Sequence, residues 1–293
     1  MRTVSVLLAL STVLCLVSMS APAQQATSSS ETSGSETSQS ASIIQQSLTA
    51  LTGGSAVTDV TMTGAYTVTN ASGTQSGTIR MVATASGQGE STVTLPSGTY
   101  SEIRSIAAGS ASMIETGPDG IPHAISTQTA VSPNPAWFCP ALVLAAASSP
   151  NYSSSYIGQE MLNGETVQHL AVWWLPGNSS SSSSGTLTQF WQQVTRHDIY
   201  LDASSRLPVS MTFPLHPYDP QSPTKPLIPY RGSNADRTIQ LLFFDYQVVE
   251  GRLVALHIRS TMKTSVGTVT SDIHISSVTF NTGATVSMPS AAN

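Results

Sequence analysis

Charged side chains are scarce in this chain of 293 residues, where Asp, Glu, Lys and Arg together make up 9%. Ordinary soluble domains carry about 25%. There are 11 basic and 16 acidic residues, and the basic residues form no block along the sequence. Because nucleic acids and anionic membranes attract concentrated positive charge, this composition excludes a nucleic-acid partner. Ser and Thr supply much of the polar surface instead.

Cysteine is nearly absent. Cys15 lies within the apolar N-terminal run, and Cys139 is the only other cysteine. If the N-terminal segment is removed on export, Cys139 stands alone and no internal disulfide can form. Its neighbours Trp137, Phe138 and Leu142 are apolar. We therefore interpret Cys139 as a buried filler of the core rather than a nucleophile.

Catalytic and metal-binding motifs are also missing. No two histidines stand at the i,i+2 or i,i+4 spacing of a metal site, and there is no Gly-x-Ser-x-Gly elbow or phosphate-binding glycine loop. His197 and Asp198 are adjacent in a predicted strand, so their side chains should point to opposite faces. His257 and His274 could approach each other on the wetter face of the last hairpin. We predict no metal, no cofactor and no enzymatic activity.

The N-terminus has the anatomy of a secretory signal peptide. Arg2 precedes an uncharged apolar run that is shorter than the roughly 20 residues of a spanning helix, and Ala21-Pro22-Ala23 offers a cleavage site. We predict that residues 1–23 are removed, which leaves a mature chain without a transmembrane segment. The expected location is the periplasm or cell envelope, with the extracellular space as the alternative.

Residues 24–40 contain Ser, Thr, Gln and Glu but no large apolar side chain, which predicts a disordered Ser/Thr-rich tail. Residues 41–52 place Ile43, Leu48 and Leu51 on one helical face. This spacing predicts a short amphipathic helix, which ends at a Gly-Gly pair.

Beyond residue 56 apolar residues no longer follow helical spacing but recur at every second position, which is typical of strands. Short connections between strands favour antiparallel meanders over parallel crossovers. The Asn163-Gly164 pair is a strong hairpin signal. The predicted strands are 76–85, 90–96, 99–107, 155–162, 165–174, 196–202, 206–213, 237–249, 252–264 and 268–281, after an initial strand from residue 56.

Residues 135–149 interrupt this pattern with an apolar insertion. Asn134 can cap a helix and Pro135 suits its first position. Pro140 would disturb one continuous helix, so two short turns are expected. The insertion has almost no polar face, which indicates that it is buried or acts as an apolar lid.

Two further features concern the second half of the chain. Residues 214–236 form a Pro-rich connection, and irregular loops longer than about 15 residues are often functional, so we expect a gate. In the last strand the apolar residues change parity, which predicts a bulge near Ser276-Ser277. In the strand before it, Val254, Leu256 and Ile258 should form a dry face.

The order of these elements resembles a known family. The stretches that carry the resemblance are DIYLDASSRLPVSMTF (198–213), FDYQVVEGRLVALHIRS (244–260) and ISSVTFNTGA (275–284). They resemble the outer-membrane lipoprotein carrier (LolA-like) superfamily, and also exported bacterial proteins without an assigned function. The resemblance implies a mainly β (α+β) fold: a strongly curved, incomplete antiparallel barrel wrapped around short helices, forming a single domain over residues 41–293.

The resemblance and the apolar aromatics together suggest that a hydrophobic ligand binds between the curved sheet and the helices. The expected partner is a lipid or a lipidated protein. The alternative is a cell-envelope interaction or sensor module whose core is filled by its own side chains, and a hydrolase would require Ser, His and Asp to converge in one cleft. The expected cavity-lining residues are Trp137, Phe138, Leu142, Trp191, Phe243 and Leu256.

Overall fold

A computed structural model of the protein describes most of the predicted domain. The predicted signal peptide and almost all of the Pro-rich connection 214–236 lie outside the described residues, so the signal peptide and the gate stay predictions. The described residues are 32–107, 110–125, 134–175, 189, 191–193, 195–214, 238–264 and 267–288.

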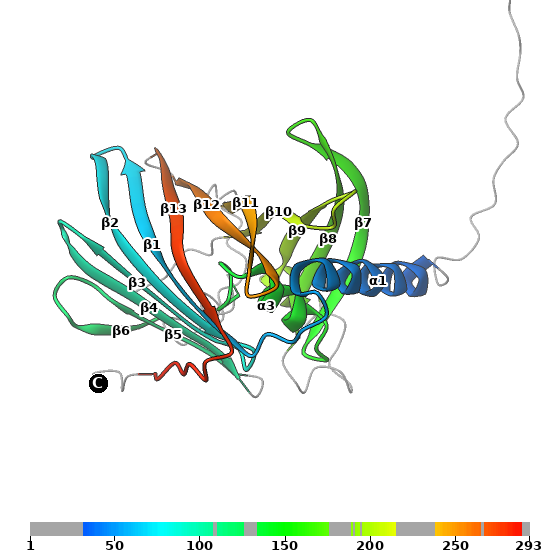
Figure 1. Ribbon diagram of the computed structural model, residues 1–293, viewed down its shortest axis with the longest axis horizontal. Coiled ribbons are helices and arrows are strands. Elements are labelled where there is room, and N and C mark those ends of the chain that lie inside the picture. Colours follow the sequence, from blue (N-terminus) through cyan, green and yellow to red (C-terminus); the bar gives the residue numbers. More distant parts are fainter. Residues whose placement is uncertain are drawn as a thin grey trace, which may run out of the picture.

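The described strands form one antiparallel sheet that curves around the helices without closing into a barrel (Figure 1). Strands that follow one another in the sequence are paired in the sheet, except β6 and β7, which form its two edges. The first and last strands, β1 and β13, also pair with each other. The predicted fold class is confirmed. The strands are β1 (Asp59–Asn70), β2 (Gly73–Thr84), β3 (Gln88–Leu95), β4 (Gly98–Ala107), β5 (Ser110–Thr116), β6 (Pro122–Ile125), β7 (Tyr152–Leu162), β8 (Glu165–Trp174), β9 (His197–Asp202), β10 (Pro208–Pro214), β11 (Thr238–Val249), β12 (Arg252–Thr264) and β13 (Gly267–Phe280).

The alternation of side chains explains which face of each strand is buried. In β9 the residues His197, Ile199 and Leu201 are buried, while Asp198 and Tyr200 between them are half-buried on the other face. The same period of two runs through the sheet and places the apolar residues on its concave side. The helices lie on this side (Figure 1).

The predicted bulge in the last strand is present. Thr63 of β1 pairs with Ser277, but the next residue, Gly64, pairs with Ile275, so Ser276 is an extra residue in β13. This insertion lets Ile275 and Val278 both face the core although their parity differs. The parity change in the sequence therefore located the bulge correctly.

The dry face of β12 differs from the expectation at one residue. Val254 and Ile258 are buried and Leu256 packs against the core, but Ala255 is also buried. The cause lies in β11, where Asp245 has a φ of 55°. This left-handed residue breaks the alternation, so that Tyr246, the partner of Ala255, also turns to the core.

Helix α1 (Thr32–Thr52) begins earlier than predicted, so residues 32–40 belong to a helix and not to a disordered tail. The buried side of this helix continues through small polar residues. Ser40 is buried, and its hydroxyl lies 2.9 Å from that of Ser154 in β7. A helical face built from serine leaves no pattern of large apolar residues in the sequence.

The apolar insertion forms a turn over residues 135–138 followed by helix α3 (Pro140–Ala147). Pro140 interrupts the insertion as predicted, but the first helical position is that of Pro140 and not that of Pro135, and the second part is a helix and not the short turn expected. Helix α1 packs against β7, β12 and α3, and α3 packs against β7. Both helices therefore cover the half of the sheet that contains β7 (Figure 1). Among the helices that the structure describes, none is long and apolar enough to cross a membrane.

The carboxylate of Asp59 in β1 binds the C-terminal segment that follows β13. Asp59 accepts hydrogen bonds from the backbone N–H groups of Thr282 (2.9 Å) and Gly283 (3.1 Å). Burial alone would raise the pKa of Asp59, but these hydrogen bonds outweigh burial and hold the pKa below its ordinary value. Asp59 therefore stabilises this end of the sheet in its ionised form.

Candidate ligand-binding site

An open pocket of about 270 Å³ lies between α3 and the ends of several strands. It is close to the expected position of a cavity between the sheet and the helical insertion. Its described lining residues are Thr84, Ala85, Ser86, Gly87, Ile106, Asn134, Ala136, Leu142, Ala145, Ala146, Ser149, Asn151, Tyr152 and Trp174.

One wall of the pocket is the apolar surface of α3. The helix starts with Pro140, which needs no hydrogen-bond acceptor for a backbone N–H, and continues with apolar residues only. Most of them are buried, but Ala145 is exposed and Ala146 is half-buried, and both line the pocket with Leu142. This wall offers apolar surface that a ligand would remove from water.

The rim of the pocket is polar and uncharged. The carboxamide oxygen of Asn134 accepts a hydrogen bond from the backbone N–H of Ala136 at 2.9 Å, which fixes the turn before α3. The carboxamide nitrogen of Asn134 then donates to the hydroxyl of Tyr152 at 3.3 Å. The backbone N–H of Asn134 donates to Nε2 of His197 at 3.1 Å. These contacts hold the rim in one arrangement.

Trp174 lines the far side of the pocket and joins the two halves of the sheet. It packs in a small apolar cluster with Ala111 and Met113 of β5, and Trp191 contacts this cluster. The rings of Trp174 and Trp191 meet edge to face, with centroids 5.1 Å apart. This cluster is separate from the main core and holds β8 near β5, so that the pocket is bounded from both sides.

Comparisons with known proteins concern the fold. No family model and no curated protein matches the chain. Among solved structures, the chain is similar to a DUF1329 family protein from Desulfovibrio piger, with a TM-score of 0.50 and 10% identity over 85% of this chain and 95% of that one.

Two further solved structures cover most of the chain. One is a putative outer membrane lipoprotein-sorting protein domain from Vibrio parahaemolyticus (TM-score 0.48, 15% identity, 84% of this chain and 93% of that chain). The other is a LolA superfamily protein from Nitrosomonas europaea (TM-score 0.47, 9% identity, 82% and 92%). The likeness to the DUF1329 family protein shows a shared fold. At such low identities the likeness concerns the fold alone.

The six expected lining residues occupy three environments in the structure. Leu142 lines the pocket beside α3. Phe138 and Phe243 are buried in the main core cluster, and Trp137 and Leu256 pack against that cluster. Trp191 packs on the cluster of Trp174. Several lining residues were missed because Tyr152 precedes the predicted start of its strand, and Ala145 and Ala146 carry no aromatic signal.

Cys139 is buried in the main core cluster, as the sequence predicts. Burial raises the pKa of its thiol to about 11, although hydrogen bonds from the backbone of Leu142 and Ala141 oppose the shift. The thiolate that a nucleophile needs is therefore unfavourable at neutral pH. This agrees with a packing role.

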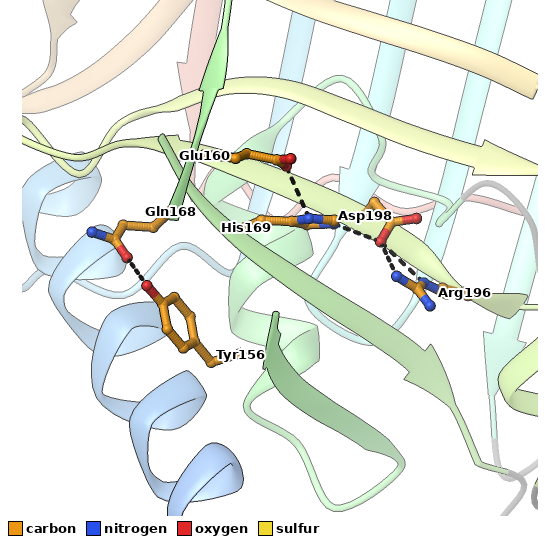
Figure 2. A network of polar contacts seen from close by, with 6 residues as sticks. All are labelled: Tyr156, Glu160, Gln168, His169, Arg196 and Asp198. Atoms are coloured by element: carbon orange, nitrogen blue, oxygen red, sulfur yellow. Dashed lines mark hydrogen bonds and ion pairs between the residues drawn. The ribbon is translucent and has the colours of Figure 1, made fainter. Parts of the chain in front are cut away.

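The convex face of the sheet carries a polar network that no motif in the sequence indicates (Figure 2). His169 of β8 lies between two carboxylates, with Nε2 2.8 Å from Oδ1 of Asp198 and Nδ1 3.0 Å from Oε1 of Glu160. Arg196 also binds Asp198, at 2.7 Å. Burial would raise the pKa of Asp198, but the contacts with His169 and Arg196 lower it below its ordinary value.

A second network of the same kind crosses β12 and β13. His257 and His274 stack with their ring centroids 4.3 Å apart, and Nε2 of His257 lies 2.8 Å from Oδ1 of Asp272. Arg259 donates to the same oxygen at 2.8 Å. The expected approach of the two histidines is confirmed.

Neither network has the geometry of a catalytic triad. A triad histidine binds a carboxylate with one ring nitrogen and turns the other to a nucleophile. The second nitrogen of His169 faces Glu160, and that of His257 faces Asp245 at 4.0 Å. Within the described ranges, no group of three or more His, Cys, Asp or Glu side chains is placed to hold a metal ion.

His197 gives the protein a specific sensitivity to acid. Burial lowers the pKa of His197 to about 4, from an ordinary value of 6.5, although a backbone hydrogen bond and Asp198 oppose the shift. The unfolded chain therefore binds more protons between these two pKa values, and acid favours unfolding. We expect the free energy of unfolding to fall by about 2 kcal/mol between pH 7 and pH 5 through this group alone.

Urea unfolding at both pH values measures this loss, with His197→Gln as the comparison. The variant keeps a hydrogen-bond acceptor for the N–H of Asn134 but has no titrating ring. Between pH 7 and pH 5, the free energy of unfolding of the variant should fall by less than that of the native protein. An equal loss in both proteins would show that His197 is not the responsible group.

Proposed function

We propose that this protein is an exported, non-enzymatic binding protein that holds a hydrophobic ligand, an acyl chain of a lipid or of a lipidated protein, in the pocket beside α3. The observation that carries the proposal is the apolar wall of α3, where Ala145 and Ala146 face an open pocket. The sequence resemblance to the lipoprotein carrier superfamily implies the same class of ligand. Export rests on the predicted signal peptide.

The size of the pocket sets the size of the ligand portion that it holds. An apolar cavity of about 150 Å³ binds benzene, which has six carbon atoms. By proportion, about 270 Å³ accommodates roughly eleven non-hydrogen atoms. This matches the end of one acyl chain rather than a whole lipid. Burial of apolar surface, worth about 25 cal/mol per Å² before association costs, would drive binding.

The test is to purify the exported protein without detergent and to analyse an organic extract by mass spectrometry. We expect acyl-containing molecules in the extract, and uptake of a fluorescent acyl probe that these molecules displace. An empty extract together with no probe uptake would contradict the proposal.

The alternative, an envelope interaction or sensor module, has one observation in its favour. Phe138 and Phe243 are both packed in the main core cluster, so the deep interior is filled by the chain itself in that region. This reading predicts that no acyl probe is taken up and that crosslinking in the envelope captures a protein partner on the outer surface.

A further inference from the structure

The hydroxyl group of Tyr152, at the rim of the pocket, can donate a hydrogen bond to a ligand. The carboxamide oxygen of Asn134 is already bound to the N–H of Ala136, so Asn134 presents its nitrogen to Tyr152. The oxygen of Tyr152 is therefore the acceptor in that contact. The Tyr152 hydroxyl donates no hydrogen bond to any residue that the structure describes, and Tyr152 lines the pocket.

The surroundings of this hydroxyl are uncharged. The described lining includes no carboxylate, ammonium or guanidinium group. Burial raises the pKa of Tyr152 to about 12, although the contact with Asn134 opposes the shift, so the hydroxyl keeps its proton at neutral pH. Behind Asn134, His197 is neutral because burial lowers its pKa to about 4.

The guanidinium group of Arg104 in β4 does not supply a positive charge to the lining of the pocket. Arg104 is buried, and its Nε donates to a carboxylate oxygen of Glu102 at 2.5 Å. Arg104 is also absent from the described lining, whereas Ile106, two residues along the strand, belongs to it. The charge of Arg104 acts on His197 behind the rim, but among the described residues no cation lines the pocket. An anionic ligand would therefore lose its hydration without a direct contact to a cation, which is costly.

We infer that the pocket selects an uncharged acyl group, an ester or an amide, whose carbonyl oxygen accepts a hydrogen bond from the hydroxyl of Tyr152, and that it discriminates against a free carboxylate. This inference rests on the proposed function and adds the chemical class of the ligand's polar end. Apolar atoms of the ligand lie along α3, while the carbonyl lies at the rim. Tyr152 is then the residue that sets the specificity.

The experiment is calorimetric titration of the purified protein near neutral pH with three probes: methyl octanoate, octanoate and octyl methyl ether. The ester and the ether differ chiefly in the carbonyl oxygen, and octanoate adds the charge. We expect the ester to bind about fivefold more tightly than the ether, the value of one net hydrogen bond. Octanoate should bind more than about tenfold more weakly than the ester.

Tyr152→Phe removes the hydroxyl and keeps the ring. It should weaken binding of the ester about fivefold and leave binding of the ether unchanged. Tyr156→Phe is the matched control, because Tyr156 lies in the same strand and its hydroxyl donates to Gln168 at 2.6 Å within the protein (Figure 2). This control should not change binding of either probe.

The outcomes separate the two proposals. If none of the three probes binds the native protein, the proposed function fails. If the probes bind but octanoate matches or exceeds the ester, or Tyr152→Phe leaves the ester unaffected or weakens ester and ether equally, the inference about Tyr152 is overturned and the binding function stands. Thermal unfolding of each variant confirms that it is folded before titration.

Discussion

Replacing Ala145 with tryptophan is expected to lower the affinity for methyl octanoate by more than about a hundredfold. Ala145 is exposed on α3 and lines the pocket, so an indole ring at this position would fill much of a space of about 270 Å³. Because the space is open, the larger side chain does not have to displace the core, and the protein should still fold. Calorimetric titration with the ester measures the loss.

The matched control for Ala145→Trp is Ser148→Trp. Ser148 is exposed at the C-terminal end of α3, where its hydroxyl donates to the carbonyl of Leu144, and it is not among the described lining residues. This variant should bind the ester like the native protein. Native affinity in a folded Ala145→Trp variant would mean that the ligand binds elsewhere.

Replacing Gly89 with valine is expected to lower the free energy of unfolding by about 4 kcal/mol. Gly89 lies in β3 beneath the turn that precedes α3, and a Cβ atom at Gly89 would stand 2.1 Å from the carbonyl oxygen of Pro135. The backbone of β3 and that of the turn must then move apart, which displaces the insertion from the sheet. Urea unfolding measures the change in stability.

Gly117→Val provides the comparison for Gly89→Val. A Cβ atom at Gly117 would meet only the carboxylate of Asp119, at 3.5 Å, which is an ordinary contact. The free energy of unfolding of this variant should stay close to that of the native protein. If Gly89→Val is equally stable, the insertion is not seated on β3 in the way that the structure indicates.

The strands could be predicted from the sequence because each has a strong local signal. Asn163 and Gly164 both have positive φ values in the hairpin between β7 and β8, the conformation that this residue pair favours. The parity change at Ser276 located the bulge, since a regular strand cannot bury both parities on one face. Pro140 correctly indicated that the insertion is not one continuous helix, although its second part is a helix of eight residues and not the short turn expected.

The candidate site was harder to predict because it depends on contacts between distant segments. Asn134 and Tyr152 meet His197 and α3 only after the sheet has curved, and none of them carries a motif. The pairing of His169 with Asp198 likewise depends on the register of β8 against β9 (Figure 2). Aromatic content indicated an apolar interior but could not separate side chains that fill it from those that border a space.

The position of a bound acyl ester tests the central claim most directly. Crystals grown with methyl octanoate that carries bromine at its chain end would locate the ligand by anomalous scattering. We expect the bromine beside Ala145 and Ala146 and the ester carbonyl at the hydroxyl of Tyr152. Absence of bromine from this pocket at a saturating concentration, or its presence only at another surface, would contradict the claim that the pocket beside α3 is the binding site.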